Sequence, residues 1–342
     1  MSFTGGLEAD HRVDSSNSMR PETAARVAAC VEKLRRQRVY RHVLAVVVCG
    51  SAGRGEDRPL PPGGGSDIDL MIITDSRSPF VGRRIAQVLN ESRDSGIEGG
   101  QVPRATLRVH RTLLNYEARC NGTVVDGARA VLAEIPMRGP ADIPRWEAVR
   151  LLFNRLFEHI KLSAGLQDED GCIAKTYEAI GEAQLVLERR YRPSFAERWE
   201  EVRERPLPET VPRLQEKYLQ TATHRLGATA PPIASVETAQ ADLLQALSAA
   251  LGLYTGLDGD LQAKLAALSR QEHNWLHRVY WIPRNALLGE PILLRYVLTD
   301  PSLVIWRDGL DYLTGRAAAA DPAKLLLRWQ ACPQILRPRV CP

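Results

Sequence analysis

Two aspartates and a glycine–serine pair carry the clearest chemical signal in this sequence. Asp67 and Asp69 alternate at the start of one apolar run, and Gly50 and Ser51 follow the end of another. Because alternate side chains of a strand share a face, both carboxylates are expected to point the same way, and paired carboxylates suit a hard cation such as Mg²⁺. Gly50 lets a ligand approach the backbone closely, and the amide and hydroxyl of Ser51 can donate to phosphate oxygens. Together they predict a site for a metal-bound nucleoside triphosphate.

Two buried strands and a loop are needed to bring these residues together. Val43–Val48 is rich in β-branched residues and predicts the first strand, and Asp67–Thr74 predicts the second. Pro59–Gly65, between them, is predicted to be a loop because it is made of proline and glycine. Further predicted elements of this part are a helix beginning at Pro21, a helix over Phe80–Arg93, a third strand over Thr106–His110, a short strand over Thr123–Val125 and a short helix over Ala128–Ile135.

The pattern changes near residue 140, where helical periodicity replaces the mixture of strands and helices. Helices are predicted from Pro144 onward, and over 173–191, 212–226, 235–254, 260–282, 291–298 and 321–330. We therefore predict an α+β protein, with a mixed sheet and flanking helices followed by an all-helical C-terminal domain. The predicted divisions are a mobile N-terminal tail at 1–19, a catalytic domain at 20–140 and a helical acceptor-binding domain at 141–342.

Composition narrows the classes of protein and partner. The 342 residues carry a formal net charge of +4, which gives no support for a nucleic-acid partner, and the six cysteines form no CxxC pair or zinc-type cluster. The N-terminus lacks the basic and apolar regions of a signal peptide, and no apolar stretch approaches the roughly 20 residues that span a bilayer. The sequence predicts a cytoplasmic protein without a membrane partner and leaves the oligomeric state open.

The site motif resembles the signature of a known superfamily. GS at positions 50–51, a spacer and SDIDL at positions 66–70 are similar to the motif of the DNA polymerase beta-like nucleotidyltransferases, and within them to small bacterial enzymes that nucleotidylate antibiotics or other small molecules. The resemblance implies that Gly50 and Ser51 hold the triphosphate and that Asp67 and Asp69 bind Mg²⁺. It also implies a mixed-sheet catalytic domain followed by helices that hold the acceptor.

The sequence departs from this pattern in its long spacer and in its third carboxylate. Many members carry that carboxylate on the next core strand, where it binds metal or acts as general base, but the strand predicted at Thr106–His110 holds no Asp or Glu. Glu98 precedes this strand and Glu117 follows it, and Asp126, just after Val124 and Val125, stays as an alternative candidate if another strand is the matching one. Three interpretations stay open: a carboxylate of the helical domain is the base, the acceptor is already ionised and needs none, or the chain binds nucleotide and catalyses poorly.

The helical domain offers candidates for the missing group. Lys175, Glu178 and Glu182 are spaced by three and four residues, so one helix face carries all three. The functional interpretation is a lysine for phosphate and a glutamate, represented by Glu178, for the acceptor hydroxyl. The alternative is a solvated face with an intrahelical ion pair. Arg54, after the glycine turn, either contacts a phosphate or faces solvent.

The predicted function is Mg²⁺-dependent transfer of a nucleoside monophosphate from a nucleoside triphosphate to a hydroxyl or phosphate of a small molecule, with ATP as the expected donor. The alternatives are a nucleotidyltransferase that acts on RNA or protein, and a nucleotide-binding regulatory protein with a degenerate site. The predicted catalytic residues are Asp67, Asp69 and Glu178, the metal ligands are Asp67 and Asp69, and the nucleotide contacts are Gly50, Ser51, Arg54, Ser66 and Lys175.

Overall fold

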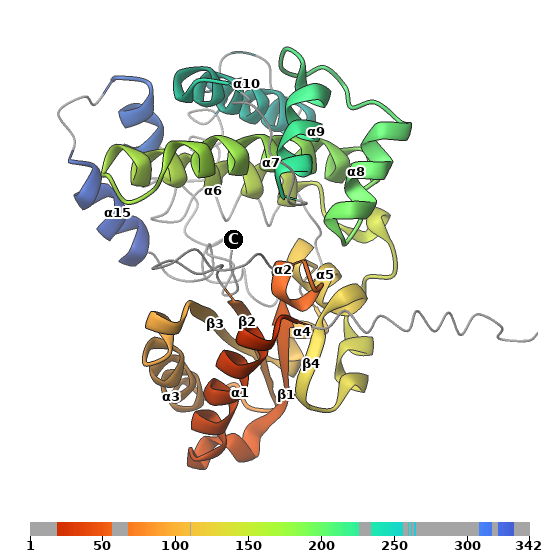
Figure 1. The fold of residues 1–342 in the computed structure, drawn as a ribbon, viewed down its shortest axis with the longest axis vertical. Helices are drawn as coiled ribbons and strands as arrows, with labels where there is room; N and C mark the ends of the chain where they lie inside the picture. The colour runs from red at the N-terminus through yellow and green to blue at the C-terminus, as the bar shows by residue number, and fades with distance from the viewer. Residues whose placement is uncertain are drawn as a thin grey trace, which may run out of the picture.

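The chain forms a mixed sheet with flanking helices, followed by a group of helices (Figure 1). The computed structural model describes residues 19–56, 68–109, 111–225, 234–255, 259, 261, 263–264, 308–316 and 321–331. The α+β class is confirmed, while the predicted domain boundary stays a prediction. The tail predicted at 1–19 and the helices predicted at 260–282 and 291–298 lie wholly or almost wholly outside the described residues.

The elements of the sheet-containing part are short. In chain order they are α1 (Pro21–Arg35), η1 (Arg38–His42), β1 (Val43–Cys49), α2 (Gly50–Gly53), β2 (Ile68–Thr74), α3 (Pro79–Asn90), η2 (Arg93–Ser95), β3 (Ile97–Pro103), α4 (Arg104–Leu107), α5 (Leu113–Asn121), β4 (Thr123–Gly127), η3 (Arg129–Glu134) and η4 (Pro140–Asp142). The helices that follow are α6 (Trp146–Ser163), α7 (Glu169–Leu187), α8 (Phe195–Glu204), α9 (Leu214–Arg225), α10 (Val236–Thr255) and α15 (Pro322–Ala331).

The sheet has the strand order β3-β2-β1-β4. Strand β1 runs antiparallel to β2 and β4, whereas β2 runs parallel to β3. Every residue of β2 is buried, as expected for a central strand with an almost continuous apolar sequence. The first two predicted strands and the strand predicted at Thr123–Val125 therefore agree with β1, β2 and β4.

The third predicted strand is wrong. The strand that pairs with β2 is β3, at Ile97–Pro103, and Thr106 lies in the helical turn α4 instead. A proline at the N-cap position of α4, Pro103, ends the strand just before that turn. The short helix predicted at Ala128–Ile135 forms as the 3₁₀-helix η3. The observed third strand therefore contains a carboxylate, Glu98, whereas the predicted strand contained none.

The two faces of the sheet pack against different parts of the chain. One face packs against α1 and α3 in a cluster of buried side chains that includes Val46, Val48, Ile68, Leu70 and Ile72. The other face belongs to a second cluster, which starts with Ala45, Val47, Met71 and Ile73 and continues without a break into α6, α7 and α10. In Figure 1 the later helices lie beyond the end of the sheet that carries α2. The sheet and the later helices thus share one apolar core.

Local capping fixes where the later helices begin. The Asp168 side chain accepts a hydrogen bond from the Gly171 amide at the start of α7, and Ser194 and Glu197 form a capping box at the start of α8.

Across the described ranges, no helix combines the length and apolar character needed to cross a bilayer.

Candidate active site at the β1–β2 end of the sheet

The turn after β1 has a backbone that requires glycine. Gly50 has φ of +62°, and a Cβ atom there would lie 2.6 Å from Oδ2 of Asp69. A Cβ atom on Gly53 would lie 2.2 Å from the carbonyl oxygen of Val48. Side chains at these two positions are excluded by contact with the sheet. The half-buried Ser51 lies between them, and its carbonyl accepts a hydrogen bond of 2.8 Å from the Glu56 amide.

Asp69 lies directly beside this turn. It is the register partner of Cys49, the last residue of β1, and its side chain is only 4% exposed. Met71 and Ile73, which share its face of β2, belong to the cluster that continues into the later helices, whereas Ile68 points toward α1 and α3. The Asp69 side chain therefore leaves β2 on the face opposite Ile68, as the alternation along a strand requires. Asp67 and Ser66 lie outside the described residues.

Glu98 is a residue of this face that the predicted site did not include. It is the register partner of Asp69 on the parallel strand β3, so the two side chains leave the same face of the sheet. Its neighbours agree with this orientation: Ile97 packs with α1 and α3, and Val102 packs against the opposite cluster. The Glu98 side chain is 34% exposed and lies 3.9 Å from the Arg93 guanidinium.

The sequence did contain a signal for Glu98. Both β2 and β3 begin with isoleucine followed by a carboxylate, at Ile68-Asp69 and at Ile97-Glu98. Glycines at 99 and 100 obscured the strand, because glycine has low strand propensity. Gly99 has φ of +150°, and a Cβ atom there would lie 2.1 Å from the Leu70 carbonyl oxygen. The close approach of β2 and β3 therefore requires glycine at position 99, although glycine lowers the strand propensity of this segment.

Carboxylates on adjacent strands fit a hard divalent cation. Asp69 and Glu98 would supply oxygen ligands from one face, and Asp67 would add a third if its side chain points with that of Asp69. Within the part of the chain that the structure describes, no group of three or more His, Cys, Asp or Glu side chains has a metal-binding arrangement. Among the described residues, Asp69 and Glu98 are thus the two carboxylates of this face that could contribute to such a site.

Asp126, the alternative candidate for the third carboxylate, has a different set of contacts. Its register partner on β1 is Val46, three residues before the Cys49 that faces Asp69. Its carboxylate accepts a hydrogen bond from the Tyr40 hydroxyl and lies 2.9 Å from Nε of Arg35. Although burial alone would raise it, the pKa of Asp126 is lowered by the Arg35 and Tyr40 hydrogen bonds. Asp126 therefore holds the end of α1 against β4.

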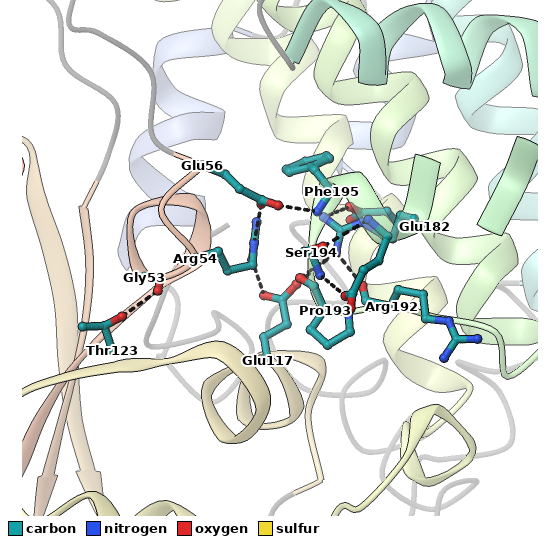
Figure 2. Close-up of polar contacts among 12 residues, drawn as sticks. Gly53, Arg54, Glu56, Glu117, Thr123, Glu182, Arg192, Pro193, Ser194 and Phe195 are labelled. Carbon is teal, nitrogen blue, oxygen red and sulfur yellow. Dashed lines mark hydrogen bonds and ion pairs between the residues drawn. The ribbon is translucent and has the colours of Figure 1, made fainter. Parts of the chain in front are cut away.

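Arg54 turns inward from the glycine turn (Figure 2). Its Nε lies 2.7 Å from Glu56 Oε2, and its Nη1 lies 3.3 Å from Glu117 Oε2 on α5. The Arg54 side chain is 6% exposed, so it does not face solvent as one interpretation of the sequence proposed. Although burial opposes the charge, the pKa of Arg54 is raised because Glu117 and Glu56 favour the guanidinium.

Lys175 and Glu178 lie on α7, on the helix face that also carries Glu182. Lys175 is paired at 3.6 Å with Glu158 of α6, so its ion pair joins two helices instead of lying within one. Burial raises the pKa of Glu158, but Lys175, Arg155 and Lys161 outweigh it and the pKa is lowered. Glu178 is half-buried. The structure brings Glu178 near Glu182, and it is one cause of the raised Glu182 pKa.

Glu182 is the most perturbed carboxyl group of this helix face. Burial raises its pKa to about 7, against the effect of Arg198, which lies 2.9 Å away, while Glu178 and Glu117 add to the increase. A buried carboxyl group beside other carboxylates is costly to ionise. The helix face therefore holds a group that titrates near neutral pH.

Comparison with known proteins assigns no family. No family model matches the chain, and neither a curated protein nor a solved structure matches it.

Proposed function

We propose that this chain is a Mg²⁺-dependent nucleotidyltransferase that transfers a nucleoside monophosphate from a nucleoside triphosphate, with ATP as the expected donor, to a small molecule. The observation that carries the proposal is the register pairing of Asp69 with Glu98 on one face of the sheet, directly against Gly50. A glycine turn beside adjacent carboxylates joins the two requirements of such a reaction, a backbone that admits phosphate and ligands for a cation.

The proposal gives each residue of the turn and sheet a role. Gly50 and Ser51 bind the triphosphate through backbone amides and the serine hydroxyl, and Ser66 belongs to the same site. Asp69 and Glu98, with Asp67, would hold the Mg²⁺. The cation would neutralise charge on the phosphate that is attacked.

The proposed chemistry is a displacement at the α-phosphorus. An acceptor oxygen forms the new bond to this phosphorus, the bond to the β-phosphate oxygen breaks, and pyrophosphate leaves. If the acceptor is a hydroxyl, its proton passes to a carboxylate, for which Glu98 and Glu178 are the candidates. If the acceptor is a phosphate, no proton is transferred. Glu98 makes a general base available within the sheet, so the helical part need not supply one.

The later helices are proposed to hold the acceptor. Glu178 is half-buried on α7, and Lys175 is 37% exposed despite its ion pair with Glu158. Both side chains share a helix face with Glu182, which is in contact with the Arg198 that also reaches Glu117 of the sheet-containing part. Lys175 is proposed to contact phosphate, and Glu178 to contact the acceptor.

The alternative of a nucleotide-binding regulatory protein with a degenerate site has less support. It relied on the lack of a carboxylate on the third strand, and Glu98 lies on β3 beside Asp69. An RNA or protein acceptor is distinguished from a small molecule by the experiment below.

The test is pyrophosphate release with Mg²⁺, a panel of nucleoside triphosphates and panels of small-molecule, RNA and protein acceptors, followed by mass spectrometry of the products. Asp69→Asn is expected to lower the rate at least about a hundredfold, because electrostatic stabilisation at the phosphate is lost. Asp75→Asn is the matched control, since Asp75 is an exposed residue that directly follows the far end of the same strand. If the protein binds ATP but turns over none of the acceptors, the proposal that it is an enzyme is refuted.

A further inference from the structure

A buried cluster of charged side chains joins the glycine turn to the later helices (Figure 2). We call it the arginine–glutamate cluster, and its members are Arg54, Glu56, Glu117, Glu182 and Arg198. Arg198 on α8 reaches Glu182 on α7 at 2.9 Å through Nη2 and Glu117 on α5 at 3.5 Å through Nη1. Glu117 lies 3.3 Å from Arg54, which in turn lies 2.7 Å from Glu56. The cluster therefore runs from α7 to the turn after β1.

The first turn of α8 is attached to the same cluster. The Phe195 amide donates a hydrogen bond of 2.8 Å to Glu56 Oε1. The Phe195 ring lies 5.5 Å from the Arg54 guanidinium carbon and 4.3 Å from that of Arg198, measured to the ring centroid. Both arginines therefore pack on one aromatic side chain, which adds cation–π attraction to the ion pairs.

The backbone of the turn passes this attachment on to Gly50 and Ser51. The Arg54 amide donates to the Gly50 carbonyl at 3.3 Å, and the Glu56 amide donates to the Ser51 carbonyl at 2.8 Å. A displacement of the Arg54 or Glu56 side chain would therefore strain hydrogen bonds that shape the turn. The turn has only four residues in its helical segment, so it has little internal structure of its own to resist such a displacement.

We infer that Arg198 is a positioning residue: through Glu117 and Phe195 it holds Arg54, and so fixes the conformation of the Gly50–Gly53 turn from the helical part of the chain. The inference about the turn stands on contacts alone. Its consequence for nucleotide affinity rests on the proposed function.

The chemistry of arginine explains why this residue type is needed. Two separate guanidinium nitrogens of Arg198 face Glu182 and Glu117, and Nη1 also donates to the Tyr191 hydroxyl at 2.8 Å. The single ammonium group of a lysine keeps the charge but cannot make this fork of contacts. Arg198→Lys should therefore preserve a cation beside Glu182 while it loosens the connection to Glu117 and Arg54.

The first test is hydrogen–deuterium exchange of the full chain without ligands. In Arg198→Lys, the amides of residues 54–56 are expected to exchange about tenfold faster than in the wild type, because local opening of the turn becomes easier. Amides of β1 and β2 should keep their wild-type rates. Arg203→Lys is the matched control, since Arg203 is an exposed residue of α8 whose guanidinium lies 2.5 Å from Glu200. Wild-type exchange at residues 54–56 in a folded Arg198→Lys protein would overturn the inference.

The second test is equilibrium binding of a fluorescent ATP analogue with Mg²⁺. Arg198→Lys is expected to weaken binding about tenfold, the equivalent of one lost contact to a charged group. If the effect passes through Glu117, then Glu117→Gln and the double variant should bind as weakly as Arg198→Lys, without addition of the two effects. Additive losses, or unchanged binding in Arg198→Lys, would contradict it.

A further variant guards against failure to fold. Glu56→Gln keeps a carbonyl oxygen for the Phe195 amide and removes the charge beside Arg54, so it loosens the same turn without leaving Glu182 unpaired. It should reproduce the faster exchange at residues 54–56. If the wild type binds no nucleotide at all, the proposed function fails, and the exchange experiment still decides the role of Arg198.

Discussion

Asp69 and Glu98 are register partners on the parallel strands β2 and β3, and both side chains leave the sheet on the face opposite α1 and α3. This pairing places a carboxylate on the third strand, where the strand predicted from the sequence had none. Asp69, the neighbour of Glu98, also lies directly against Gly50, because a Cβ atom at Gly50 would lie 2.6 Å from Asp69 Oδ2.

Glu98→Gln should lower kcat by about 10² to 10⁴, the range for loss of a general base or a metal-binding carboxylate. Nucleotide binding should be affected less, because the glycine turn is unchanged. Glu91→Gln is the control, since Glu91 is an exposed carboxylate at the end of α3. Steady-state pyrophosphate release checks the prediction. A Glu98→Gln enzyme with wild-type kcat would assign the base to another residue, with Glu178 the next candidate.

Gly50→Ala should disable the site and destabilise the fold only modestly. The positive φ at this position costs a non-glycine residue about 1–2 kcal/mol, and the new methyl group would meet Asp69 Oδ2 at 2.6 Å. Asp69 must then move, so Mg²⁺-dependent nucleotide binding should be lost. Gly139→Ala is the control, because a Cβ atom at Gly139 meets nothing within 4 Å. Urea unfolding and nucleotide titration of both variants provide the measurements, and normal binding by Gly50→Ala would refute the assignment.

Glu182→Gln should change how stability depends on pH. Burial raises the pKa of Glu182 from 4.5 to about 7 in the folded chain, so the folded state binds more protons than the unfolded state between these values. Stability from this group is thus fully present below about 4.5 and is lost as pH rises through about 7. The glutamine variant lacks this loss, so its stability relative to the wild type should rise with pH across that window.

Urea midpoints at several pH values between 5 and 8 would measure this difference. Glu169→Gln, an exposed residue in the first turn of the same helix, is the control. A difference between wild type and Glu182→Gln that stays constant with pH would show that Glu182 does not titrate in this range.

Lys175→Gln should raise the KM for the nucleoside triphosphate about tenfold if the lysine contacts phosphate, as expected for a charge-assisted hydrogen bond. Lys161→Gln is a close control, because both lysines pair with Glu158. Each variant removes one cation from the same carboxylate, so a purely structural role predicts similar effects from the two. Steady-state kinetics with varied nucleotide separates the cases, and equal KM values in both variants would make Lys175 a structural residue.

The sequence alone determined the centre of the sheet and the shape of the turn. Val43–Cys49 and the strand from Ile68 are apolar and rich in β-branched residues, so their burial and conformation follow from local composition. Gly50 and the alternation around Asp69 are local as well: one residue permits a positive φ, and the period of two in a strand fixes the other's orientation.

The tertiary structure decided which residues stand beside that turn. Ile97–Pro103 contains two consecutive glycines and becomes a strand through its hydrogen bonds to β2, so pairing outweighs local propensity there and brings Glu98 to Asp69. Arg54 is buried for a similar reason. Its neighbours Glu117, Phe195 and Arg198 come from α5 and α8, far along the chain, and only the packing of those helices turns the side chain inward from the turn.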